Sequence, residues 1–246
     1  MDRLIWTAVT GMNASMTRQR MIASNMANAQ TTGFRAEVMA QSPLTLDGPS
    51  LEVRAMNQAL VKGARMEAGT VTQTGRALDV ALNGSALLAV QAADGGEAYT
   101  RRGDLTLSPN GVLVTGDGAT VLGEAGPVSV PPGSTVSIGP DGAVLAANPA
   151  DPAAPPQQIA RLKLATWHGS RIEKGLDGLF RVPDGGVLPQ DAEASLTPAA
   201  LEGSNVKTTE VLVEMVEAQR LYDMRTKLIA TAKELDEQGA SLMRIA

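Results

Sequence analysis

The sequence predicts an α+β protein in which long N- and C-terminal helices form a coiled-coil domain and flank an inserted, mainly antiparallel β domain. Two observations support this fold class: apolar residues recur every three or four positions near both ends, and short apolar runs separated by turn residues fill the middle. Helices separated by most of the chain can share a hydrophobic seam only by folding together or by packing against other copies. Assembly is therefore a more natural expectation than catalysis.

An amphipathic helix is expected from about Arg3 to Asn28, a length of roughly 40 Å at about 1.5 Å per residue. We expect it to end by Gly33, because the polar run before this residue loses apolar periodicity and glycine is favoured just past a helix. Gln19 breaks the apolar stripe once. The predicted seam residues of this helix are Ile5, Val9, Met12, Met16, Ala23 and Met26.

A second long helix is expected at the C-terminal end, where leucines recur every seven residues. Small residues and Arg225 occupy the intervening positions, so the seam is thin and suits a helix that packs closely against several neighbours. An ordinary core-facing helix would account for the same spacing. The predicted seam residues here are Ala218, Leu221, Leu228, Ala232, Leu235 and Leu242.

Changes in composition divide the chain into four parts. Residues 1–34 are expected to form the first helix, 35–75 an extended connecting arm, 76–200 the β domain and 201–246 the second helix. The arm is assigned on its polar, irregular sequence, which contains prolines and glycines.

Turn signals separate the strands of the expected β domain. Asn110-Gly111 and Asp141-Gly142, each preceded by proline, favour tight turns because these pairs tolerate positive φ. A proline-rich stretch at 148–156 is expected to be a loop. The runs expected to form strands are 78–82, 86–91, 105–107, 112–115, 120–122, 128–130, 136–138, 144–146 and 159–167.

Composition limits the class of protein. The 246 residues are 43% hydrophobic with a net charge of −5, so nothing suggests a nucleic-acid partner. Aromatic residues make up only 2%, which is low for a small-molecule pocket or a stacking platform. There is no cysteine, which excludes disulfides and thiolate chemistry. No long apolar run or secretory signal is present, so we expect no cleaved signal peptide.

The search for a catalytic, metal or cofactor site is negative. The single histidine, His168, rules out a two-histidine metal site, and a lone histidine beside a glycine at a strand end is usually a surface residue. Acidic residues such as Asp94 and Asp117 stand in glycine-rich turns, where aspartate is favoured for local backbone bonding. Paired catalytic carboxylates would look similar in one sequence. No phosphate-binding glycine motif occurs, and no catalytic residue, cofactor or small-molecule substrate is predicted.

Distinctive motifs occur in order along nearly the whole chain. The most specific is the N-terminal run Asn25-Met26-Ala27-Asn28-Ala29, followed by Thr32-Gly33-Phe34-Arg35. The other runs are Met1 to Ala8, Gln73 to Gly84, Ala98 to Gly103, Gly111 to Thr115, Leu201 to Val206 and Met215 to Tyr222. Together these motifs resemble those of bacterial flagellar rod and hook proteins. The opening Met-Asp-Arg-Leu-Ile and the short stretch between Arg35 and Gln73 are most similar to the proximal-rod members, with the distal-rod paralogue as the alternative.

The resemblance implies a structural subunit of the rod, not an enzyme. Family members are exported through the flagellar type III apparatus without a cleaved signal and polymerise in the periplasm, with their terminal helices forming an axial tube and the β domain outside it. The implied partners are copies of the chain, other rod proteins and the export apparatus. A long helix with a thin seam is then expected to gain most of its stability from packing partners.

Overall fold

The computed structural model describes residues 2–45, 55–148 and 154–243, and leaves the side chains at 2–7, 41–45, 55–58, 62, 235–237 and 239–243 undescribed. The chain divides into two compact units. The helical unit contains residues 1–27, 37–63 and 207–246, and the β unit contains residues 28–36 and 64–206. The predicted α+β class, with a helix at each end and a large antiparallel β domain between them, is confirmed.

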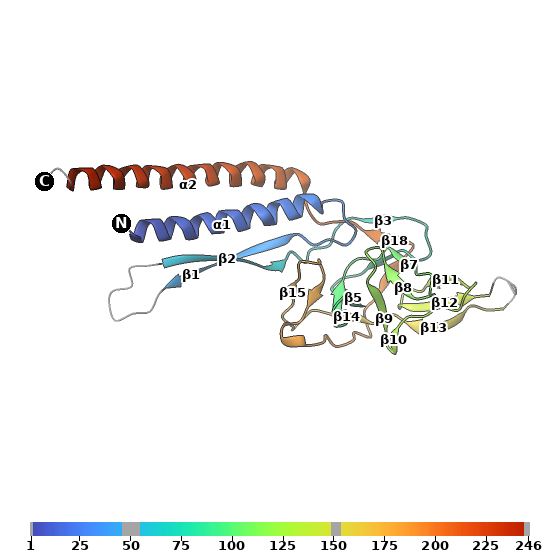
Figure 1. Cartoon of the computed structure of the whole chain (residues 1–246). Coiled ribbons are helices and arrows are strands. Elements are labelled where there is room, and N and C mark those ends of the chain that lie inside the picture. Colours follow the sequence, from blue (N-terminus) through green and yellow to red (C-terminus); the bar gives the residue numbers. More distant parts are fainter. Residues whose placement is uncertain (1, 46–54, 149–153, 244–246) are drawn as a thin grey trace. The chain divides into compact units, whose positions relative to one another are not determined.

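The helical unit consists of two long helices and a pair of strands. Helix α1 (Asp2–Ala27) and helix α2 (Thr208–Met243) lie side by side and run in opposite directions, with the strands β1 (Glu37–Thr45) and β2 (Ala55–Ala64) along α1 (Figure 1). The strands β1 and β2 pair with each other. Sequence analysis reads this segment only as an extended arm because prolines and glycines interrupt it and its apolar residues follow no steady alternation.

Few of the described side chains in the two helices are buried. In α1 the buried residues with described side chains are Ala14, Ser15, Ile22 and Asn25, and in α2 they are Val211 and Ala218. Small side chains let helix backbones approach closely, but they interlock weakly. Helix α1 ends at Ala27, one residue before the expected Asn28, and residues 28–33 form turns in which the Thr31 amide donates to the Asn28 carbonyl.

The β unit is built from short antiparallel strands. Its largest sheet, among the described residues, has nine strands in the order β15-β16-β6-β5-β9-β8-β7, with β10 paired to β9 and β14 paired to β5. The strands β11, β12 and β13 form a second sheet, and β17-β4 and β18-β3 form two pairs. The bounds are β3 (Val71–Gln73), β4 (Val80–Leu82), β5 (Ala86–Gln91), β6 (Glu97–Thr100), β7 (Leu105–Leu107), β8 (Leu113–Thr115), β9 (Thr120–Gly123), β10 (Gly126–Pro127), β11 (Thr135–Ile138), β12 (Ala143–Ala147), β13 (Gln157–Arg161), β14 (Leu164–Thr166), β15 (Glu173–Lys174), β16 (Phe180–Arg181), β17 (Leu196–Pro198) and β18 (Ala200–Glu202), with a short 3-10 helix at Pro183–Gly185.

Strand β5 lies at the centre of the hydrophobic core. Leu88 and Val90 pack into the larger apolar cluster of the unit, whereas Leu87 and Ala89 pack into a smaller one on the opposite face. Successive side chains of a strand point to opposite faces, so a strand covered on both sides needs apolar residues at every position. This explains the uninterrupted run Ala86-Leu87-Leu88-Ala89-Val90.

Most of the predicted strands are present. The run 86–91 matches β5 and 105–107 matches β7, while 159–167 divides into β13 and β14. The prediction of a strand at 128–130 is wrong: Val128 and Val130 are buried, but the prolines on both sides of this run remove ladder donors, and only an isolated bridge at Ser129 forms. The predicted loop at 148–156 falls largely on residues outside those described.

Candidate assembly surfaces and the buried ion-pair cluster

A buried carboxylate in the β unit binds two buried arginines. Glu202, at the end of β18, is 1% exposed, and its Oε1 accepts hydrogen bonds from Arg35 Nη2 at 2.7 Å and from the Gly69 amide at 2.8 Å. Its Oε2 accepts from Arg101 Nη2 at 2.6 Å and from Arg101 Nε at 2.8 Å. We call Arg35, Arg101 and Glu202 the ion-pair cluster. It joins three segments that are far apart in sequence.

Arg101 is bound on every side. Its remaining donors bond to the carbonyls of Leu82 at 2.5 Å, Gly84 at 2.7 Å and Ala86 at 2.9 Å. Burial lowers the pKa of Arg101, Glu202 opposes that shift, and the like charge of Arg35 adds to it. Two arginines and one glutamate leave an excess positive charge, and Nε and Nη1 of Arg35 have no hydrogen-bond partner within the described part of the chain.

Two glycines, Gly33 and Gly69, are needed for this close packing. Gly33 has φ of +67°, its amide donates to the Glu202 carbonyl at 2.7 Å, and a Cβ at this position would lie 2.4 Å from the Arg101 carbonyl oxygen. A Cβ on Gly69 would lie 2.1 Å from the Gly203 carbonyl oxygen. Neither position has room for a side chain without backbone movement.

Asn205 holds together the segments of the β unit that lead to the terminal helices. Its Oδ1 accepts from the Ala36 amide at 2.7 Å, and its Nδ2 donates to the carbonyls of Arg65 at 2.7 Å and Glu67 at 2.9 Å. The Asn205 amide also donates to the Phe34 carbonyl at 3.3 Å. One side chain therefore fixes the chain after α1, the chain after β2 and the chain before α2 to one another.

A second asparagine fixes the strand pair in the helical unit. Asn25, 4% exposed on α1, donates from Nδ2 to the Glu37 carbonyl at 3.1 Å and accepts from the Glu37 amide at 2.8 Å. Ser24 Oγ donates to Glu37 Oε1 at 3.1 Å. A pair of strands alone is marginally stable, and these bonds attach its first residue to α1.

The predicted seam residues occupy several environments. Ala218 is buried in the contact between α1 and α2, while Met12, Met26, Leu221 and Ala232 are half-buried. The exposed ones are Val9, Met16, Ala23 and Leu228, with Leu228 66% exposed. The side chains of Ile5, Leu235 and Leu242 lie outside those described. The structure brings only part of the predicted set to the contact within one chain, and their role in contacts between chains stays a prediction.

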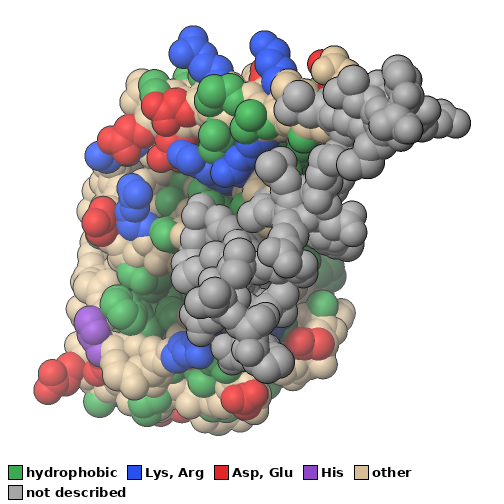
Figure 2. All heavy atoms as spheres, turned by 90° about the vertical axis from the view of Figure 1, so that its left-hand side faces the viewer, with side chains coloured by type: hydrophobic (Ala, Val, Ile, Leu, Met, Phe, Trp, Pro, Cys, Tyr) green, Lys and Arg blue, Asp and Glu red, His purple; other side chains and the backbone are tan. Residues whose placement is uncertain are grey.

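Helix α2 exposes large apolar side chains that α1 does not cover. Six of these side chains are more than two-fifths exposed. Helix α2 lies at the top of Figure 1, and the upper edge of the molecule in Figure 2 shows hydrophobic side chains beside basic ones. We call these six residues the outer α2 surface. They are Leu212, Val213, Met215, Val216, Met224 and Leu228.

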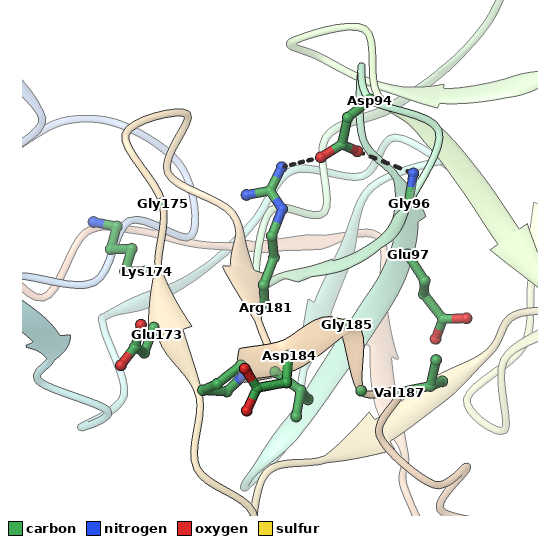
Figure 3. A pocket seen from close by; sticks show the side chains of 13 residues that line it. Asp94, Gly96, Glu97, Glu173, Lys174, Gly175, Arg181, Asp184, Gly185 and Val187 are labelled. Carbon is green, nitrogen blue, oxygen red and sulfur yellow. Dashed lines mark hydrogen bonds and ion pairs between the residues drawn. The ribbon is translucent and has the colours of Figure 1, made fainter.

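The β unit contains an open hollow of about 460 Å³ beside β15 and β16. Figure 3 shows Arg181 and Asp94 on one side of it, with an ion-pair distance of 3.8 Å, and Arg181 also binds Asp177 at 2.6 Å. Glu97 binds Lys163 at 2.7 Å, and Lys174 donates to the Arg35 carbonyl at 2.8 Å. These side chains already have partners within the fold.

Other functional signals are weak. His168 is exposed and contacts the Trp167 ring at a centroid distance of 4.5 Å. Within the described ranges, no group of three or more acidic, histidine or cysteine side chains is arranged to bind a metal ion. In the same ranges, neither helix is long and apolar enough to span a membrane.

Comparisons with known proteins place the chain in a family. Three family models match it: "Flagella basal body rod protein" at residues 5–35, "Flagellar hook protein FlgE/F/G D1 domain" at 81–146 and "Flagellar basal body rod FlgEFG protein C-terminal" at 197–242. The chain is 39% identical to the flagellar basal-body rod protein FlgF of Salmonella typhimurium over 252 residues, covering 100% of both proteins. It is 40% identical to FlgF of Escherichia coli over 95% of both, and 33% identical to FlgG of Agrobacterium fabrum over 95% of this chain and 96% of that protein.

The chain belongs to the flagellar basal-body rod protein family. Within that family it is most like FlgF. The predictions of a structural rod protein rather than an enzyme, and of greater similarity to the proximal-rod member, FlgF, than to the distal-rod paralogue, FlgG, are confirmed by these relatives.

The ion-pair cluster was missed by sequence analysis. Arg35, Arg101 and Glu202 each stand in a different run that carries the family resemblance. The presence of all three charged residues in such runs is the signal that could have indicated the cluster. Nothing in the spacing of these residues shows that one carboxylate binds both arginines.

Proposed function

We propose that the chain is a structural subunit of the proximal rod that polymerises through its terminal helices and transmits torque. The observation that carries this is the outer α2 surface, which exposes large apolar side chains on a helix already packed against α1 along another stripe. Burying apolar surface contributes about 25 cal/mol per Å², so neighbouring subunits would be strongly favoured to cover it. The similarity to FlgF proteins supports the rod as the site of assembly.

The predicted seam residues enter this proposal in two ways. Ala218, with its small side chain, allows close approach of α1 and α2, whereas Val9, Met16 and Leu228 are exposed and available to other chains. In the assembled rod the terminal helices would form a coiled-coil axial layer, with the β unit as the outer domain. The proposed parts are two axial segments, at 1–34 and 201–246, which contain α1 and α2, the arm at 35–75 and the outer domain at 76–200.

The proposed route follows from membership of the family. The chain would leave the cytoplasm through the flagellar type III export apparatus without a cleaved signal peptide and assemble in the periplasmic space. Its partners would be copies of itself and the proximal and distal rod proteins. A subunit of this kind has no use for a nucleic acid or a small-molecule substrate.

Antibody labelling of purified basal bodies tests the proposal. A tagged chain that restores motility to a deletion strain should be found in the part of the rod nearest the cytoplasmic membrane. Label at the distal part would favour the FlgG-like alternative, which the lower identity to FlgG makes the weaker candidate. Restored motility without label in the basal body would contradict a rod subunit of either kind.

A further inference from the structure

One charged side chain lies in the contact between the two terminal helices. Arg225 of α2 is half-buried, and its Nη1 donates to the Gly11 carbonyl and to the Ser15 hydroxyl of α1. Gly11 and Ser15 are one helical turn apart, so the guanidinium bridges successive turns of the facing helix. Ser15 is 3% exposed, which makes its hydroxyl a buried group that needs a partner.

Arg225 can reach its backbone acceptor because Gly11 has no side chain. The position of a Cβ on Gly11 would lie 3.8 Å from Arg225 Cζ, in van der Waals contact with the guanidinium. A larger side chain at residue 11 would occupy the space through which Arg225 reaches the carbonyl oxygen. A shift of α2 by one turn toward the end of α1 would move the guanidinium from Gly11 and Ser15 to Ser15 and Gln19, where the bare surface ends.

The rest of the contact contributes little to fixing the axial register of the two helices. The helices are antiparallel, so a step of seven residues back from Arg225 along α2 corresponds to a step of seven residues forward along α1. From Gly11 and Ser15 this step leads to Arg18 and Ile22. Ala218 of α2 therefore lies opposite these two residues. Ala218 and Ile22 are among the most buried residues of the pair, in agreement with that register. The buried side chains among the described part of α2, Val211 and Ala218, carry no polar group, whereas a polar residue at a seam position can specify register.

We propose that Arg225 is a positioning residue that fixes the axial register of α2 against α1 through the Gly11 carbonyl and the Ser15 hydroxyl. Register within one chain is a property that holds whether or not the chain enters a rod. In a polymer it would set the outer α2 surface at the same height in every subunit.

The chain contains no cysteine, so two introduced cysteines give clean sites for spin labels. Arg20→Cys and Ala230→Cys replace exposed residues on α1 and α2 and would be labelled in the full-length chain. Pulsed electron paramagnetic resonance should give one narrow distance in this parent. With Arg225→Met, which keeps a long apolar side chain without donors, we expect a second population in which α2 has moved by one helical turn, about 5.4 Å, so that the distance between the labels changes by up to that amount.

Two further variants control the measurement. Lys227→Met makes the same exchange on the exposed side of α2 and should keep the parent distance. Arg225→Lys retains a donor and should restore the parent distance as the main population. An unchanged single distance in Arg225→Met would overturn the assignment, and so would a broad distribution in the parent. Loss of helical circular dichroism in Arg225→Met would also count against it, because the residue would then hold the helices themselves rather than their register.

Discussion

Arg35 and Glu202 are 167 residues apart in sequence and form a 2.7 Å ion pair with both side chains almost completely buried. The first stands in the segment after α1 and the second in the strand that leads toward α2. Since Glu202 also binds Arg101, the carboxylate is the only negative charge of the ion-pair cluster and compensates two buried cations. Loss of Glu202 would therefore leave two buried cations without their shared counter-charge.

Glu202→Gln should destabilise the β unit by about 3–5 kcal/mol, because it leaves Arg35 and Arg101 buried without a counter-charge. Urea unfolding of the full-length chain, monitored by a spectroscopic signal that reports on the β unit, measures the change in the free energy of unfolding. The control is Glu124→Gln, which alters a carboxylate that is 44% exposed. If the two substitutions cost the same, the buried pairs would have little net effect on stability.

Gly33→Ala should cost more than Gly75→Ala, although both glycines have positive φ. The left-handed conformation alone costs about 1–2 kcal/mol for a non-glycine residue, and Gly75 has nothing within 4 Å of the added Cβ. At Gly33 the Cβ would lie 2.4 Å from a backbone oxygen, which should add about 1–3 kcal/mol of overpacking. Thermal unfolding of the two variants gives the difference. Equal losses would mean that the backbone around Gly33 yields easily.

Arg181→Met should raise the pKa of Asp177 toward its ordinary value of 3.8. In the native chain the pKa is lowered chiefly by the hydrogen bonds from Arg181, at 2.6 and 3.0 Å. Because the pKa of Asp177 is lower in the folded state, its ion pair with Arg181 stabilises the fold above pH 3.8. This contribution is lost as the pH falls through the folded-state pKa of Asp177. Carboxyl ¹³C NMR follows the titration. Arg171→Met, which removes a different exposed ion pair, should leave Asp177 unchanged.

Hydrogen exchange in the free chain should be faster in α1 and α2 than in the strands of the β unit. Among the described side chains of α2, only Val211 and Ala218 are buried, so little packing opposes opening of this helix. Peptide-resolved mass spectrometry measures the rates. Helices as protected as β5 would show that the pair has stable partners before assembly.

Sequence alone predicted the elements whose signals are local. The run 86–91 is apolar throughout and bounded by turn residues, so β5 could be located with its limits. The strands β1 and β2 could not, because their apolar residues do not alternate regularly, Pro43 interrupts the first strand, and a hydrogen bond from Asn25 to Glu37 helps to hold them. Similarity of motifs indicated the family. The α2 residues buried against α1 were only partly predicted, because a seven-residue repeat does not show which side of the helix packs against α1 of the same chain.

The central claim is that the outer α2 surface is covered by neighbouring subunits in the rod, and Leu228→Asp tests it most directly. Leu228 is 66% exposed, so the substitution should leave the single chain folded, yet a carboxylate would be buried in the assembled contact. Thr226→Asp makes the same change in charge at an exposed position about 160° around the helix from Leu228, given about 100° per residue. The amount of each variant in purified basal bodies should be strongly reduced for Leu228→Asp and near normal for Thr226→Asp. Normal incorporation of Leu228→Asp would contradict assembly through this surface.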